Sequence, residues 1–152
     1  MEPYLNHLPT VIDWVKSQEA HILQHGQELT VNQKIDAYLI GITHIHQVRI
    51  LEVENIPMPQ NTTIQQLGKS IGLLSSRTIG TAYGYGIYIK KGYANSRQLI
   101  AHELVHTLQQ ERMGGIEAFL KQYLLECVEV GYPNGQLEIE AHTIAEEFEK
   151  DY

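Results

Sequence analysis

A chain of 152 residues is long enough to bury a core of its own and short enough to form one domain. Its formal net charge of −7 argues against nucleic acid or an anionic membrane surface as the main partner. The single cysteine, Cys127, excludes an intramolecular disulfide and a cysteine-based metal site, and its apolar neighbours indicate a small core residue.

No apolar run in the sequence reaches membrane-spanning length, so we expect no insertion into a membrane. Residues 1–5 carry no basic stretch, which predicts no signal peptide and, by default, a cytoplasmic location. The oligomeric state has no signature in the sequence.

Two helices are expected in the first part of the chain. Apolar residues recur at helical spacing from Pro9 and Thr10 to about Gly26. Thr30 and Gln33 have the spacing of a capping box and predict the start of a second helix. Its apolar residues are expected to face inward: Ile35, Tyr38, Leu39 and Ile42. We interpret this helical pair as scaffold.

A strand is expected next, because apolar residues alternate loosely over residues 48–53. Residues 57–63 are a polar loop that begins with a proline and is too short to separate domains. Residues 64–74 are ambiguous, since Gly68 and Gly72 weaken a helical interpretation.

Residues 78–93 are rich in glycine and tyrosine, and residues 87–89 predict a strand that leads into the following helix. The glycines at 80, 84 and 86 indicate either bulges or places where another backbone comes close, or else the turn of a hairpin. Both interpretations stay open.

Residues 97–113 predict a helix that contains the sequence His-Glu-Leu-Val-His. Asn95 and Ser96 are residue types that cap helices, and the glycine pair at 114–115 supplies the stop. Leucines four residues apart form an apolar stripe that anchors one side of this helix in the core.

The chemistry of this helix lies in three residues. His102 and His106 are four residues apart and share one face, so both imidazoles can bind one ion. Nitrogen ligands at this spacing suit Zn²⁺ in tetrahedral geometry. Glu103 follows the first histidine, where its carboxylate can take a proton from a water at the ion.

Two further helices are expected, from about residue 116 to 130 and from about 137 to 150. A catalytic zinc site needs a third protein ligand as well as a water. Glu138 and Glu140 are the candidates, and helix phase alone does not decide between them. Ala141 and Ala145 lie on the side of Glu138 and allow close helix approach, which favours Glu138 and leaves Glu140 as the alternative.

The sequence His-Glu-Leu-Val-His followed by Glu138-Ile139-Glu140-Ala141 resembles the gluzincin group of zinc metallopeptidases. The resemblance implies Glu138 as the third ligand. This group usually has an Asp that orients a ligand imidazole, and His142 stands at that position here.

The phrase HELVHTLQQ, preceded by a strand rich in glycine and tyrosine, also resembles small bacterial domains of unknown function. This likeness covers residues 78–148.

These features predict a zinc-dependent peptidase acting on a peptide or protein, with Glu103 as general base. An edge strand beside the metal would hold the substrate backbone, with Tyr83 and Tyr85 in contact with it. Tyr132, His142 and Tyr83 are the candidates for the oxyanion donor. The alternative is a non-catalytic zinc-binding domain with a structural or interaction role.

The fold expected is α+β and mainly helical, with a small sheet whose edge strand lies beside the His-Glu-x-x-His helix. We expect one domain over residues 1–152, in which residues 1–75 are helical scaffold and strand and residues 76–152 form the core of the zinc site.

Overall fold

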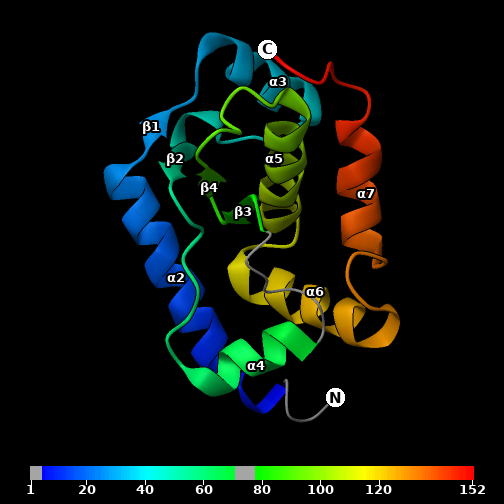
Figure 1. Ribbon diagram of the computed structural model, residues 1–152. Coiled ribbons are helices and arrows are strands. Elements are labelled where there is room, and N and C mark those ends of the chain that lie inside the picture. Colours follow the sequence, from blue (N-terminus) through cyan, green and yellow to red (C-terminus); the bar gives the residue numbers. More distant parts are fainter. Residues whose placement is uncertain (1–4, 71–77) are drawn as a thin grey trace.

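The chain folds as a small mixed sheet surrounded by helices, the mainly helical α+β class that the sequence predicts (Figure 1). The computed structural model describes residues 5–70 and 78–152. The elements are α2 (Leu8–His25), β1 (Gln27–Glu28), α3 (Val31–Ile40), the 3-10 helix η1 (Ile45–Gln47), β2 (Arg49–Val53), α4 (Thr62–Ser70), β3 (Gly80–Tyr83), β4 (Gly86–Lys90), α5 (Arg97–Arg112), α6 (Ile116–Val130) and α7 (Gln136–Ala145).

The sheet has the strand order β1-β2-β4-β3. β2 and β4 run parallel, whereas β3 and β4 form an antiparallel hairpin and β1 pairs antiparallel with β2. An edge strand lies beside α5, as expected, but this strand is β3. The strand recognised in the sequence at residues 87–89 is internal, because β2 covers its other side.

Glycines shape the β3–β4 hairpin. Gly84 forms the turn with φ +62°, a left-handed conformation that glycine adopts without strain. Gly86 lets β4 approach α2, since a Cβ there would lie 2.9 Å from the Cβ of Ile22. The hairpin turn is therefore confirmed at Gly84, whereas the close neighbour of Gly86 is a helix side chain and not the backbone that was expected.

α5 lies at the centre of the molecule and packs against β3, α3, α6 and α7 (Figure 1). One apolar cluster joins α3, the sheet and α5, and includes Ala37, Ile87, Ile89, Ile100 and Leu104. A second cluster joins α2, α6 and α7, and includes Val15, Phe119, Leu120, Cys127 and Leu137. Cys127 is therefore a buried core residue, as its neighbours in the sequence indicate.

The second helix begins as predicted but faces the other way. Thr30 and Gln33 form the expected capping box at the start of α3. Three of the four residues expected to face inward are exposed: Ile35 (50%), Tyr38 (73%) and Leu39 (65%). The buried face carries Asp36 and Ala37, because Asp36 pairs with Arg97 of α5 and Ala37 allows close packing.

The remaining elements follow the predicted order with shifted ends. Thr62–Ser70 is helical, which answers part of the ambiguity over residues 64–74, and Gly72 lies outside the described residues. α7 ends at Ala145 rather than near residue 150, and the chain after it pairs with the start of α5 through Ser96 and Asp151. Within the described ranges, no helix is long and apolar enough to cross a membrane.

Candidate metal centre

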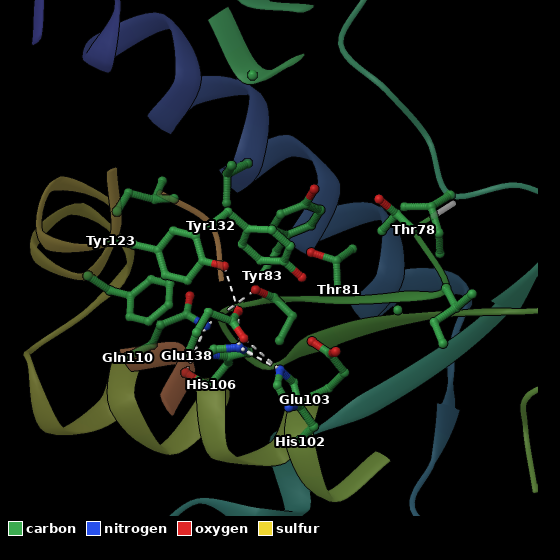
Figure 2. Close-up of a pocket in the computed structure, with 18 of the residues that line it drawn as sticks. Thr78, Thr81, Tyr83, His102, Glu103, His106, Gln110, Tyr123, Tyr132 and Glu138 are labelled. Carbon is green, nitrogen blue, oxygen red and sulfur yellow. Dashed lines mark hydrogen bonds and ion pairs between the residues drawn. The ribbon is translucent and has the colours of Figure 1, made fainter. Parts of the chain in front are cut away.

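Three side chains from two helices meet at one point in the structure. His102 and His106 lie one turn apart on α5, and their Nε2 atoms are 3.2 Å apart. Glu138 reaches them from the first turn of α7, with Oε1 at 2.9 Å from Nε2 of His106 and Oε2 at 3.0 Å from Nε2 of His102. Figure 2 shows the carboxylate between the two imidazole rings and the ring of Tyr123.

The geometry of these three donors fits a metal ion. In a tetrahedral zinc site with bonds of about 2.0–2.1 Å, neighbouring ligand atoms lie roughly 3.3 Å apart. The donor atoms of His102, His106 and Glu138 are close to that spacing without rearrangement, and all lie within 4.8 Å of one another. Two imidazoles and one carboxylate also leave a fourth position open, as catalytic zinc sites do.

The charged carboxylate of Glu138 is buried. Glu138 is 6% exposed, and burial alone would raise the pKa of its carboxyl. Hydrogen bonds from His102 and His106 outweigh burial and hold this pKa well below its usual range. Burial would lower the pKa of His106, and the hydrogen bond to Glu138 raises it instead. The pocket thus favours an ionised carboxylate with positive charge beside it.

Glu103 lies next to this group without belonging to it. The residue is 5% exposed and has no hydrogen-bond partner among the residues that the structure describes. Its carboxylate lies against β3, since a Cβ at Gly80 would be 3.3 Å from Oε2 of Glu103. Burial is the largest influence on the Glu103 carboxyl and raises its pKa, whereas the two histidines lower it. This carboxylate is free to bind a water or a substrate.

The alternative ligand, Glu140, is placed elsewhere. Its carboxylate accepts hydrogen bonds from Arg112 at 2.7 Å and from Nε2 of Gln109 at 2.8 Å. Ala141 is fully buried and α7 packs closely on α5, as expected for two helices that share a site. The structure therefore brings Glu138, and not Glu140, to the imidazoles.

Gln109 orients the second histidine, a role that the sequence did not reveal. Its Oε1 lies 2.8 Å from Nδ1 of His106, and its Nε2 also donates to the carbonyl oxygen of Leu137 at 2.9 Å. His142, which stands where gluzincins have an orienting Asp, is on the exposed side of α7 and pairs with Glu146. The sequence signal for Gln109 was its position three residues after His106, which places both on neighbouring positions of the helix surface.

Two more residues after the second histidine anchor the hairpin beside the site. The hydroxyl of Thr107 donates to the carbonyl oxygen of Gly84 at 2.9 Å, and Oε1 of Gln110 accepts from the amide of Gly84 at 2.6 Å. Within the sequence Thr-Leu-Gln-Gln, Thr107 and Gln110 therefore hold the turn between β3 and β4 in place.

Tyr123 is a further residue that sequence reasoning placed only in the core. Its hydroxyl donates to Oε1 of Glu138 at 2.6 Å, and its ring packs 5.8 Å from that of His106. The carboxylate of Glu138 is therefore held from two sides, by imidazoles and by a phenol. Tyrosine in place of phenylalanine in an apolar stripe is the signal that could have indicated this role.

The two tyrosines expected to contact substrate lie on different sides of the hairpin. Tyr83 lines the cavity at the candidate metal centre, as Tyr132 does (Figure 2). Tyr85 does not line it; its hydroxyl donates to Glu111 at 2.7 Å and its amide to Glu19 at 2.8 Å. Tyr85 thus helps to hold the hairpin against α2 and α5.

The three candidates for the oxyanion donor all line the same cavity. Tyr132 is 43% exposed and has no hydrogen-bond partner among the described residues, and burial raises its pKa to about 12. The hydroxyl of Tyr83 lies close to the side chain of Thr81, and His142 pairs with Glu146. Tyr132 is the candidate with a protonated and unengaged hydroxyl.

The metal centre opens into a cavity of about 710 Å³. Its walls include β3 and α5, and also the start of α2 together with α4 and α6. The first helix, interpreted from the sequence as scaffold, therefore contributes Val11, Trp14 and Val15 to the site. The sequence did not predict this wall, because an apolar stripe on a helix does not reveal whether it packs in a core or lines a cavity.

No protein family model, curated protein or solved structure matches this chain. Its function is therefore inferred from the chemistry of the site.

Proposed function

We propose that this protein is a zinc-dependent hydrolase of peptide bonds, as its gluzincin-like motif implies. The observation that carries the proposal is the meeting of His102, His106 and Glu138 beside the free carboxylate of Glu103. The first three side chains would hold the ion, and zinc bound there supplies a Lewis acid and lowers the pKa of a water towards neutrality.

Glu103 is the general base of the proposed reaction. It accepts a proton from the attacking water and passes it to the leaving amine, so it must both gain and release a proton near neutral pH. The pKa of its carboxyl, raised chiefly by burial, supports this double role. Its place on a rigid helix, with its carboxylate against the glycine of β3, holds it towards the cavity.

The outer edge of β3 offers a template for an extended peptide. Lys90 donates to the carbonyl oxygen of Ile79, and hydrogen-bonded pairs alternate along an antiparallel ladder. The backbone groups of Gly80 and Ala82 therefore point away from β4. Among the described residues, the side chain that hydrogen-bonds to them is Gln110, whose Nε2 lies 3.4 Å from the oxygen of Ala82. A substrate strand added here would lie beside Glu103.

Tyr132 is the proposed oxyanion donor. Its hydroxyl stays protonated across the physiological range because its pKa is raised to about 12, and it faces the cavity near Glu138 (Figure 2). A donor aimed at the charge that develops on the carbonyl oxygen contributes strongly in a site from which water is excluded.

The direct test is Glu103→Gln, which keeps the shape of the side chain and removes its basicity. Zinc content measured by elemental analysis should equal that of the wild type, and hydrolysis of a mixed peptide library should fall by 100-fold or more, on the order of a general base's contribution. Glu129→Gln, on the exposed end of α6, is the matched control and should leave both unchanged.

Unchanged hydrolysis in Glu103→Gln would refute the assignment of the base. Stoichiometric zinc without hydrolysis of any peptide in the wild type would favour the non-catalytic zinc-binding domain.

A further inference from the structure

The cavity is much larger than the metal centre, and its far wall is apolar. Side chains of α2, α4 and α6 face it: Val11, Trp14, Ile64, Leu67, Phe119 and Leu120. These residues come from segments far apart in the sequence, and the metal ligands lie on α5 and α7. The apolar wall is therefore a separate feature of the cavity, not a by-product of the metal-binding helices.

Trp14 joins this wall to the edge strand. Its ring packs edge-on against Tyr83, the last residue of β3, with ring centroids 5.7 Å apart. A peptide lying along β3 would consequently run from Glu103, which lies against Gly80, to Trp14, which packs on Tyr83 at the other end of the strand. Side chains of such a peptide alternate in direction, and those on the cavity side would share the cavity with Trp14 and Leu67, which both line it.

Among the residues that the structure describes, the apolar wall carries no lysine, arginine, aspartate or glutamate. None of the described residues that line the cavity is lysine or arginine, and the acidic ones are Glu103, Glu138 and Glu146. The first two belong to the metal centre, and Glu146 is exposed and paired with His142. A charged substrate side chain entering between α2 and α4 would lose hydration and would meet no lysine, arginine or carboxylate of the described part of these two helices, where His7 is the titratable residue that lines the cavity.

We infer that Trp14 and Leu67 form a subsite for one neutral, apolar side chain of the substrate, and that Trp14 is a specificity-determining residue. This inference rests on the proposed function for the reaction, but the binding step can be measured without it. Burying one leucine side chain contributes roughly 1.5–3 kcal/mol, which corresponds to about 10- to 150-fold in affinity.

The single tryptophan of the chain provides the readout. Zinc-loaded Glu103→Gln protein is titrated with a blocked peptide of alanine and serine that contains one leucine, while the fluorescence of Trp14 is recorded. Three further peptides carry Ser, Asp or Lys in place of the leucine. We expect a saturable change in Trp14 fluorescence with the leucine peptide and at least tenfold weaker binding of the other three.

A pair of variants in the same background separates the subsite from general surface effects. Leu67→Asp places a charge on the wall and should weaken binding of the leucine peptide at least tenfold while bound zinc stays stoichiometric. Leu23→Asp places the same change on the outer side of α2, where Leu23 is 39% exposed, and should bind like the parent. Equal affinity in both variants would overturn the subsite.

The two proposals fail in different ways. If wild-type protein cleaves peptides but the leucine, Asp and Lys peptides bind equally, the subsite is wrong and the hydrolase proposal stands. If the leucine peptide binds selectively but wild-type protein never cleaves it, the subsite stands and the hydrolase proposal is wrong.

Discussion

The amide oxygen of Gln109 lies 2.8 Å from Nδ1 of His106, and both side chains are buried. The ring therefore donates from Nδ1 and turns Nε2 towards Glu138. The same glutamine donates to α7 through the carbonyl oxygen of Leu137, so one side chain fixes the tautomer of His106 and the position of the helix that carries Glu138. Partners of this kind tune the affinity of a metal site.

Replacing Gln109 should weaken metal binding. Gln109→Leu removes the acceptor of His106 and leaves the Leu137 carbonyl without its donor, and zinc affinity should fall about 10- to 100-fold. Competition with a fluorescent chelator measures the change. Gln122→Leu, in an exposed pair with Glu126, is the matched control and should bind zinc like the wild type. Equal affinity in Gln109→Leu would show that the ring needs no such support.

Gly80 should be required for the position of the general base. A methyl group at this residue would lie 3.2 Å from Cδ1 of Leu99 and 3.3 Å from Oε2 of Glu103. Gly80→Ala should therefore shift the carboxylate by a few tenths of an ångström and lower kcat by about tenfold or more. Zinc affinity should not change, because the atoms nearest to the added methyl group belong to Leu99 and Glu103 and not to His102 or His106.

Peptide hydrolysis, zinc content and the melting temperature together check the Gly80 prediction. A loss of hydrolysis that is accompanied by a large drop in melting temperature would indicate misfolding and contradict the positioning role.

The pair of Asp36 and Arg97 should dominate the stability of the α3–α5 contact. Asp36 is fully buried and accepts two hydrogen bonds from Arg97, at 2.8 and 2.9 Å, and one from the hydroxyl of Tyr152. Arg97→Met leaves this carboxylate without its cation, and the free energy of unfolding should fall by about 3–5 kcal/mol. Urea unfolding monitored by circular dichroism measures it.

Two comparisons sharpen that measurement. The double variant Asp36→Leu/Arg97→Met should recover most of the loss, because no unpaired charge remains buried. Lys91→Met breaks an exposed pair with Glu54 and should cost at most about 1 kcal/mol. A similar loss in Arg97→Met and Lys91→Met would contradict the importance of burial.

Glu111 should make stability depend on pH. Burial alone would raise the pKa of its carboxyl, but hydrogen bonds from the amides of Thr43 and His44 and from the hydroxyl of Tyr85 outweigh it and lower the pKa below the ordinary 4.5. A carboxyl with a lowered pKa in the folded state stabilises the protein above its unfolded pKa, and this stabilisation is lost as the pH falls through the folded value.

Glu111→Gln measures this contribution. At pH 7 the variant should be less stable than the wild type by about 1–3 kcal/mol, because it replaces an acceptor of three hydrogen bonds. The difference should shrink as the pH is lowered below 4.5. Urea unfolding at several pH values gives the comparison, with Glu129→Gln as the control. A difference that stays constant from pH 7 to about 3 would contradict the lowered pKa.

Helices whose caps and apolar periodicity lie within a short stretch of sequence were predicted correctly. The capping box of Thr30 and Gln33, the cap at Ser96 and the apolar periodicity of α5 and α6 act within a few residues, and the structure has these helices where they were expected. The spacing of His102 and His106 is likewise a property of one helix, so their common face could be predicted before the fold was known.

The inward face of α3 could not be predicted in this way. Ile35, Tyr38 and Leu39 are more apolar than Asp36, and a rule based on hydrophobicity buries them. The ion pair between Asp36 and Arg97 joins residues 61 positions apart in the chain and orients the helix. The internal position of β4 could not be predicted for a similar reason, because it depends on pairing with the distant strand β2.

The sequence by itself determined the metal-binding helix, its two imidazoles and the neighbouring carboxylate, because a helical turn places residues four apart together whatever surrounds them. Only the tertiary structure decided between Glu138 and Glu140, brought Gln109 and Tyr123 to the ligands and placed Trp14 across the cavity. The positions of these side chains depend on how separate helices pack. That packing results from many contacts between segments far apart in the sequence, which no short stretch of sequence reveals.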